Sequence, residues 1–110
     1  VLGIKGNSAS DSYISQIKKN CNKYGIGFEL KMSSTEDEFI QNFEKIKNDK
    51  NISGIMFQQP LPSRLADLIN DISPEKDIEG VGINNMGKLF LLKEDTFAPC
   101  TSKAIMKIIE

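Results

Sequence analysis

The stretch ISGIMFQQPLPSRLADLIN, residues 52–70, is the part of the sequence that best predicts the fold class. It opens with a short apolar run, Ile52 to Phe57, which is typical of a strand covered on both faces in a parallel sheet. A polar and proline-rich loop follows, and Ser63 then caps a helical pattern that ends before Pro74. The stretch therefore predicts strand, loop and helix, the repeating unit of an α/β fold.

The preceding residues repeat this unit twice. The predicted elements are a first strand near the amino terminus, a helix capped by Ser8, Ser10 or Asp11 and ended by Gly25, a half-exposed strand over Ile26–Met32, and a helix from a Thr35–Glu38 capping box to near Asp49. This alternation predicts an α/β, three-layer domain with a mainly parallel sheet in which Ile52–Phe57 is a central strand. A binding site is then expected at the carboxyl ends of the strands.

Residues 74–100 fit the alternation less well. They contain glycines, a pair of asparagines and a Gly87-Lys88 turn signal. We interpret them as loops with one small hairpin, and we expect Thr101 to cap a terminal helix.

Composition excludes several classes of function. The 14 basic and 15 acidic side chains create no one-sign field, so neither nucleic acid nor a membrane surface is an expected partner. Histidine is absent, which excludes Ser-His and Cys-His catalysis within this chain. The two cysteines form no CxxC motif, and no metal site is expected. No apolar run is long enough to span a bilayer and no signal peptide is visible, so we expect a cytoplasmic protein.

Both ends of the chain interrupt a predicted element. Val1 stands at the start of a buried strand, and Glu110 stops inside a helical pattern without a terminating residue. We expect residues 1–110 to be a fragment of a longer protein.

Candidate site residues come from three segments that the predicted topology brings to one sheet edge. Tyr13 can stack on a flat ligand or pack against the core. Gln58 can bind a heterocycle or satisfy its own loop. Pro60, Leu61 and Pro62 can wall a pocket or simply turn the chain. Glu79 lies in the charged Lys76–Gly80 loop, which is either solvated or a carboxylate site for a donor-rich ligand.

The motifs, in order and at matching spacing, resemble one known family. They are Ser10-x-x-Tyr13, Gly25-Ile26, Gly54-Ile55-Met56-Phe57-Gln58-Gln59-Pro60-Leu61-Pro62, Pro74-x-Lys76-Asp77-Ile78-Glu79-Gly80, Asn85-x-Gly87-Lys88-Leu89 and Phe97-x-Pro99-Cys100-Thr101. The chain resembles the amino-terminal catalytic domain of the bifunctional methylenetetrahydrofolate dehydrogenase/methenyltetrahydrofolate cyclohydrolases, the FolD type. The resemblance covers essentially the whole chain.

The resemblance implies a role in one-carbon metabolism. Family members oxidise 5,10-methylenetetrahydrofolate with NAD or NADP, hydrolyse the methenyl product to 10-formyltetrahydrofolate, and are commonly homodimers. It implies that Tyr13 packs along a tetrahydrofolate derivative, that Gln58 orients a catalytic lysine, and that Glu79 holds the pterin. The nicotinamide cofactor is implied to bind a following Rossmann domain outside this chain, because no GxGxxG motif is present.

Several positions depart from the family pattern, and two of these departures concern the site. Others are Lys5, Ser102 and Ala104. The family places its catalytic lysine four residues after the tyrosine, and here that residue is Ile17. Lys18 is the nearest lysine, but at about 100° per residue it lies about 140° around a helix from Tyr13, unless a π-bulge rotates it back. The pterin acid, usually aspartate, is Glu79.

The departures leave two hypotheses. One is a folate enzyme whose cyclohydrolase step is impaired; the other is a catalytically inactive α/β binding or interaction module derived from the family. Hydride transfer depends mainly on the cofactor, so the loss of a lysine should affect hydrolysis more than oxidation.

Overall fold

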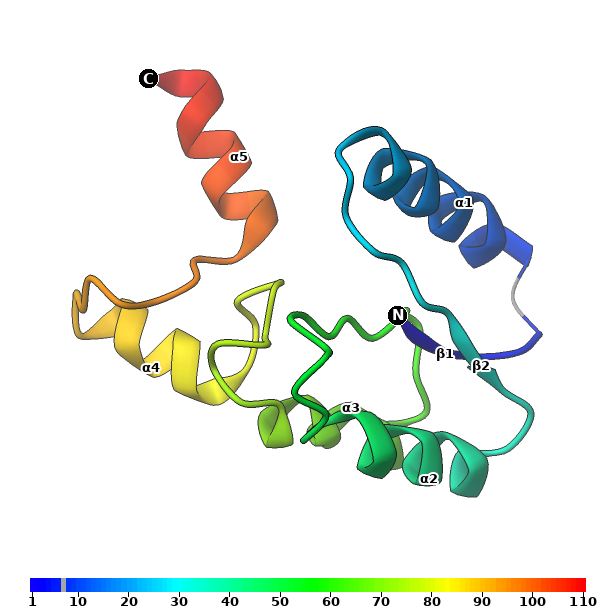
Figure 1. Ribbon diagram of the computed structural model, residues 1–110. Coiled ribbons are helices and arrows are strands. Elements are labelled where there is room, and N and C mark those ends of the chain that lie inside the picture. Colours follow the sequence, from blue (N-terminus) through cyan, green and yellow to red (C-terminus); the bar gives the residue numbers. More distant parts are fainter. Residues whose placement is uncertain (7) are drawn as a thin grey trace.

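The computed structural model describes residues 1–6 and 8–110, apart from the side chains of residues 8 and 9. Figure 1 shows the arrangement of its elements. In chain order these are β1 (Leu2–Ile4), α1 (Ser8–Lys23), β2 (Lys31–Ser33), α2 (Glu36–Ile46), α3 (Ser63–Ala66), the 3₁₀ helix η1 (Asp67–Asp71), α4 (Ile83–Phe90) and α5 (Cys100–Ile109).

The sheet is small and its pairings are parallel. β1 pairs with β2 in the register Leu2 to Lys31, Gly3 to Met32 and Ile4 to Ser33. Two single parallel bridges, Leu2 to Phe57 and Ile55 to Asp77, extend the arrangement on the other side of β1. Helix α1 lies on one side of the strands and α2 and α3 on the other (Figure 1), which confirms the predicted three-layer α/β class.

The core fills the space between the sheet and the α2–α3 layer. Phe57 packs the edge of its ring against Phe39 and Phe43, at centroid distances of 5.2 and 5.1 Å. Leu2 and Ile55 face the same cluster and are buried with it. These contacts hold the carboxyl end of residues 52–57 in place, and this end leads directly into the Gln58 loop.

Two predicted helix signals are confirmed. The Thr35 hydroxyl accepts a hydrogen bond from Glu38 N at 3.1 Å, and the Glu38 carboxylate accepts one from Ser34 N, so the capping box forms at the start of α2. Gly25 adopts a φ of +69°, and Ile26 N bonds back to Cys21 O at 2.8 Å. This left-handed residue ends α1 as the sequence predicted.

The predicted strands are shorter than expected. Over Ile26–Met32 only Lys31 and Met32 are in a strand, and residues 26–30 connect the end of α1 to the short β2. Ile52–Phe57 does occupy an interior position, between β1 and residue 77, and Ile55 and Met56 are buried. It is not assigned as a strand, because each neighbour pairs with it at a single position.

The hairpin predicted within residues 74–100 is wrong. Residues 83–90 form α4, and Gly87 does not take the positive φ that a tight turn would use. Tertiary hydrogen bonds to the buried Asn85 compensate for the weak helix propensity of this asparagine- and glycine-containing segment.

The predicted caps of the helices after residues 62 and 99 are wrong in place. For α1, the alternatives Ser10 and Asp11 lie inside the helix, and the side chain of Ser8 is outside the described part of the chain. Pro62 and Pro99 stand at the N-cap positions of α3 and α5, so Ser63 and Thr101 are inside those helices. Helix α2 ends at Ile46 rather than near Asp49.

No helix among the described residues is long and apolar enough to cross a membrane.

Candidate functional site

Gln58 stands at the carboxyl end of the buried segment 52–57. Its backbone N–H donates to Leu2 O at 2.8 Å, which continues the parallel pairing with β1. A Cβ built on Gly3 would lie 2.9 Å from Met32 Sδ and 3.2 Å from Gln58 Cβ. The side chains of Met32 and Gln58 therefore flank Gly3 on one sheet face, opposite the face of Leu2 and Phe57 that packs on α2.

The amide of Gln58 is buried and only half satisfied. Its Nε2 donates to the backbone carbonyl of Gln59 at 3.0 Å, while Oε1 has no hydrogen-bond partner among the described residues. The side chain is 8% exposed. A buried acceptor without a donor carries a desolvation penalty, so a donor that reaches Oε1 would gain a full hydrogen bond.

The proline-rich loop after Gln58 turns the chain from the buried segment 52–57 into α3. The Gln59–Pro60 peptide is cis, and Leu61 N donates to Gln59 Oε1 at 3.2 Å. Pro62 then precedes α3, and Leu61 packs partly buried against the core. The loop thereby holds the chain immediately after Gln58 in one direction.

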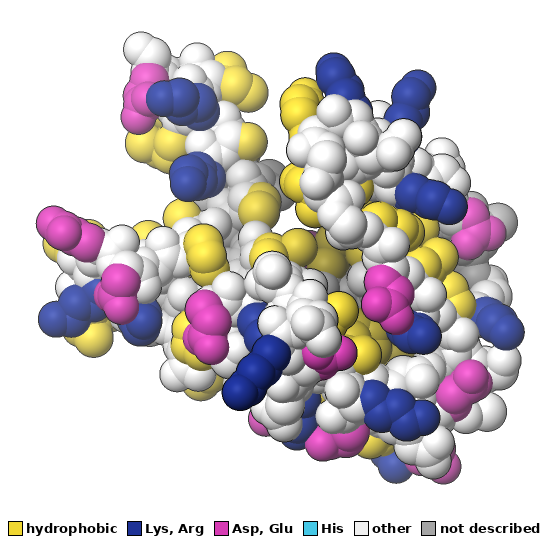
Figure 2. Space-filling view, in the orientation of Figure 1, with side chains coloured by type: hydrophobic (Ala, Val, Ile, Leu, Met, Phe, Trp, Pro, Cys, Tyr) yellow, Lys and Arg dark blue, Asp and Glu magenta, His cyan; other side chains and the backbone are white. Residues whose placement is uncertain are grey.

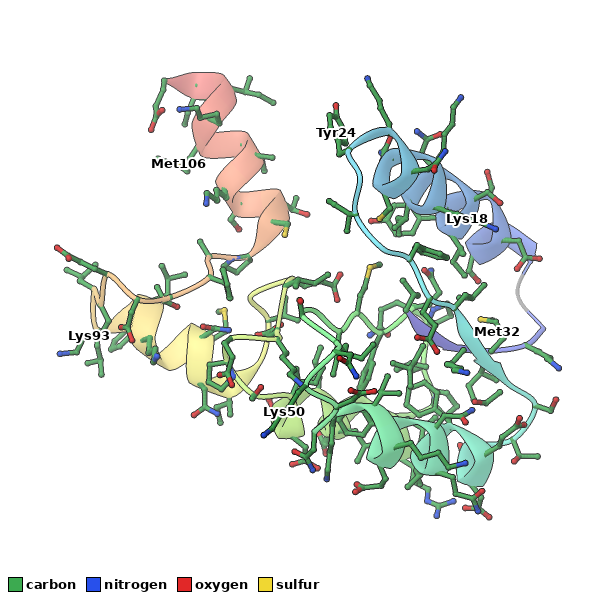
Figure 3. All side chains as sticks on the ribbon, viewed as in Figure 1. Lys18, Tyr24, Met32, Lys50, Lys93 and Met106 are labelled. Carbon is green, nitrogen blue, oxygen red and sulfur yellow. The ribbon has the colours of Figure 1, made fainter. Side chains whose placement is uncertain are left out.

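On helix α1 the side chains of Tyr13, Ile17 and Lys18 differ in burial and in the cavity that they line. Ile17 is half-buried and, with Cys21, lines a cavity against the sheet, while Tyr13 is 55% exposed at the margin of that face. Residues 8–23 are continuous α-helix without a π-bulge. Lys18 is exposed and lines a separate groove with Ile26 and Phe28; Figure 3 labels it on α1. In this geometry Lys18 and Tyr13 do not share a face.

Glu79 lies in the turn after the bridge between Ile55 and Asp77. Burial raises the pKa of its carboxyl above the ordinary value, and the charge of Asp77 raises this pKa further. Gly80 follows with a φ of +68°, and a Cβ there would lie 2.5 Å from Phe97 O. The backbone beside Glu79 is therefore closely packed and accepts only glycine at position 80.

A cavity of about 760 Å³ lies between α1 and the sheet. Its lining is mostly apolar and includes Ile17, Cys21, Met56 and Ile78. Figure 2 shows hydrophobic side chains gathered in this hollow, below the part of the surface formed by α1. Its lining includes Val1 and Lys31, at the amino ends of β1 and β2, whereas the site was expected at the carboxyl ends of the strands.

The structure brings some of the predicted site residues together. Gln58 and helix α1 lie on the same side of the sheet, and Glu79 follows the segment that pairs with Ile55. None of Tyr13, Gln58 and Glu79 lines the cavity. That the three share one cleft stays a prediction.

Comparison with known proteins establishes the family. A family model described as "Tetrahydrofolate dehydrogenase/cyclohydrolase, catalytic domain" matches residues 1–79. The chain belongs to the tetrahydrofolate dehydrogenase/cyclohydrolase family. The match includes the positions of Tyr13, Ile17, Gln58 and Glu79.

Individual members of this family are similar over the whole chain. "Bifunctional protein FolD" of Staphylococcus carnosus (strain TM300) is 38% identical and that of Staphylococcus aureus (strain JH9) 36%, each over 100% of this chain. A crystal structure of the "Bifunctional Enzyme FolD-Methylenetetrahydrofolate Dehydrogenase/Cyclohydrolase" from Campylobacter jejuni superposes with a TM-score of 0.88 at 30% identity, over 98% of this chain. The chain spans 40% of the length of these relatives.

Sequence reasoning missed the residues that hold the Glu79 turn. The sequence places Asp77 in a charge cluster that is typical of a solvated loop, but the residue is 2% exposed. Lys76 donates from Nζ to the carbonyls of Lys47 and Asp49 and so caps the end of α2. The signal that could have revealed Asp77 was the run of backbone donors in Gly80-Val81-Gly82, three to five residues after the carboxylate.

Proposed function

We propose that residues 1–110 form the folate-binding catalytic domain of a protein of one-carbon metabolism. The reactions are the NAD- or NADP-dependent oxidation of 5,10-methylenetetrahydrofolate to 5,10-methenyltetrahydrofolate and the hydrolysis of that product to 10-formyltetrahydrofolate. The observation that carries this proposal is the family match over residues 1–79, which contain all the candidate site residues. The longer protein is cytoplasmic and acts as a homodimer.

In this proposal the three polar residues bind the substrate. Tyr13 packs its half-exposed ring along the folate, Gln58 Oε1 accepts a hydrogen bond from it, and Glu79 accepts N–H donors of the pterin ring. The partly unsatisfied Gln58 amide and the half-buried Glu79 carboxyl support these assignments, because both groups gain a partner when a donor-rich ligand binds.

The nicotinamide cofactor does not fit the residues of this chain. The turn between β1 and α1 contains Gly6 but no GxGxxG motif, so a pyrophosphate would lack its usual cradle there. The cofactor is therefore assigned to a part of the longer protein outside residues 1–110.

The hydrolytic step is impaired in this proposal. Ile17 stands where the family has its catalytic lysine, and an isoleucine can neither hold nor transfer a proton. Lys18 does not replace it on a regular helix. A protein that binds folate but catalyses neither the oxidation nor the hydrolysis would correspond to the inactive binding module.

Calorimetric titration with tetrahydrofolate tests the binding assignment. The 110-residue chain should bind, and Glu79→Gln should weaken binding by about 10- to 100-fold, the effect of losing a charge-assisted hydrogen bond. Glu94→Gln is the matched control, because Glu94 is an exposed glutamate in another segment. Absence of binding by the unaltered chain, or equal effects of the two variants, would contradict the proposal.

A further inference from the structure

The turn that carries Glu79 is organised around one buried carboxylate. We define the Glu79 loop as residues 78–82. Asp77 Oδ1 accepts hydrogen bonds from Gly80 N at 3.1 Å and Val81 N at 3.4 Å, and Asp77 Oδ2 accepts one from Gly82 N at 2.8 Å. A single side chain thus satisfies three consecutive backbone donors of the loop.

Asp77 is itself fixed from two sides. Its backbone is bridged to Ile55 at the edge of the sheet, where Ile55 N donates to Lys76 O at 2.8 Å. Its Oδ2 accepts a further hydrogen bond from Asn85 Nδ2 at 3.0 Å. Because Asp77 and Asn85 are 2% and 1% exposed, water does not compete for these bonds.

Asn85 extends the network to the segment before α5. Its Nδ2 also donates to Pro74 O at 2.9 Å, and its Oδ1 accepts a hydrogen bond from Phe97 N at 3.3 Å. The Thr96 hydroxyl lies 3.0 Å from Asn85 O and donates to it. The amide of Asn85 therefore joins the Asp77 carboxylate to residues 96 and 97.

The same segment closes on the Glu79 loop from outside. Cys100 N donates to Glu79 O at 3.3 Å, and the Cys100 thiol lies 3.3 Å from Ile78 O. Phe97 O and the Ala98 backbone leave room only for a glycine at position 80. The Glu79 loop is thus held between Asp77 on its inner side and residues 97–100 on its outer side.

We propose that Asp77, held by Asn85, is a positioning residue: it fixes the backbone of the Glu79 loop and so holds the Glu79 carboxylate in the position that ligand binding requires. This inference rests on the proposed function, in which Glu79 contacts the folate. In this proposal Asp77 does not touch the ligand, because four N–H groups of the loop and of Asn85 already donate hydrogen bonds to its two carboxylate oxygens. Its effect on binding therefore passes through the geometry of the loop, and a carboxylate displaced by about 1 Å loses most of an oriented contact.

A double-mutant cycle separates positioning from a general structural role. Tetrahydrofolate affinity is measured by calorimetry for the unaltered chain, Asp77→Asn, Glu79→Gln and the double variant, with Asp71→Asn as control because Asp71 is an exposed aspartate on η1. Asp77→Asn should weaken binding about tenfold in the unaltered chain and less than about twofold in the Glu79→Gln background. Equal losses in both backgrounds would overturn the proposal.

Amide hydrogen exchange tests the geometry without any ligand. Gly80 N also donates to the backbone carbonyl of Asp77 at 3.1 Å, so the Gly82 amide is the more direct probe. In Asp77→Asn the Gly82 amide should lose about tenfold or more of its protection, whereas the Gln58 amide in the sheet should not change. Unchanged protection at Gly82 would overturn the positioning role. If the unaltered chain fails to bind tetrahydrofolate, the proposed function fails and the role of Asp77 in binding fails with it, whereas binding that is equally sensitive to Asp77→Asn in both backgrounds overturns the positioning role alone.

Thr96→Val provides a milder variant if Asp77→Asn does not fold. It removes the hydroxyl that donates to Asn85 O and leaves the Asp77 carboxylate in place. Affinity should fall by about two- to fivefold, again only while Glu79 is present. An equal fall in the Glu79→Gln background would count against the proposal.

Discussion

Ile17 is the residue on which the proposed loss of hydrolysis depends. Its side chain is half-buried and lines the apolar cavity with Cys21, on the face of α1 that packs toward the sheet. An isoleucine is well accommodated there by packing alone. Position 17 can therefore stabilise the domain while contributing nothing to proton transfer.

Restoring a lysine at position 17 should restore hydrolysis. A positioned acid–base group typically contributes about 10²–10⁴-fold, so Ile17→Lys should raise the rate of methenyltetrahydrofolate hydrolysis by a factor in this range. The rate is followed by the loss of methenyltetrahydrofolate absorbance, with Lys18→Ala as the matched variant. If the unaltered chain already hydrolyses at an enzymatic rate and Ile17→Lys adds nothing, the assignment of Ile17 is wrong.

The raised pKa of Glu79 makes stability depend on pH in a defined direction. The folded state binds this proton more tightly than the unfolded state, so Glu79 destabilises the fold progressively as pH rises from its ordinary pKa of 4.5 through the raised value. Urea midpoints of the unaltered chain and Glu79→Gln should therefore diverge over that window, with the variant gaining relative stability at higher pH. A difference that is constant with pH would contradict this.

At the scale of elements, the glycine in the Glu79 loop and the glycine in α4 differ in backbone conformation and in the space around them. Gly80 has a positive φ and no room for a Cβ beside Phe97 O, whereas Gly87 lies within α4 with open space around it. The same substitution should therefore have opposite effects at the two positions.

Gly80→Ala should lower the free energy of unfolding by about 1–3 kcal/mol, because it forces a strained backbone conformation and a backbone clash. Gly87→Ala should raise it by up to about 1 kcal/mol through helix propensity. Chemical denaturation of both variants measures the two changes. A Gly80→Ala variant as stable as the unaltered chain would show that the turn relaxes without cost, and a destabilised Gly87→Ala variant would contradict the second expectation.

At the scale of the whole molecule, the sequence of residues 1–110 contains no GxGxxG motif, the usual signature of a dinucleotide site. The 110-residue chain should therefore reduce neither NAD nor NADP in the presence of 5,10-methylenetetrahydrofolate. The reduction of NAD or NADP is measured from the absorbance of the reduced nicotinamide and compared with a reaction without protein. Reduction above that background would place a cofactor site within residues 1–110.

The sequence by itself determined the α/β class, because local signals carry it. The apolar run Ile52–Phe57, the Thr35–Glu38 capping box and the Gly25 terminator each depend on neighbouring residues only. The capping box and the terminator form as predicted, and Ile55, Met56 and Phe57 are buried although residues 52–57 are not assigned as a strand. The positions of the motifs around Tyr13, Gln58 and Glu79 likewise identified the family, which the comparison over residues 1–79 confirms.

Tertiary structure alone decided the environments of the polar residues and the bounds of the weaker elements. Asp77 and Asn85 appear in the sequence as ordinary loop residues, and they become buried only because donors from positions 80–82 and 97 converge on them. The same long-range bonds make residues 83–90 a helix in spite of their turn signals. Strand lengths also depended on partners: residues 26–30 and 52–57 could not form longer strands beside a three-residue β1, because a strand extends only as far as its neighbour pairs with it.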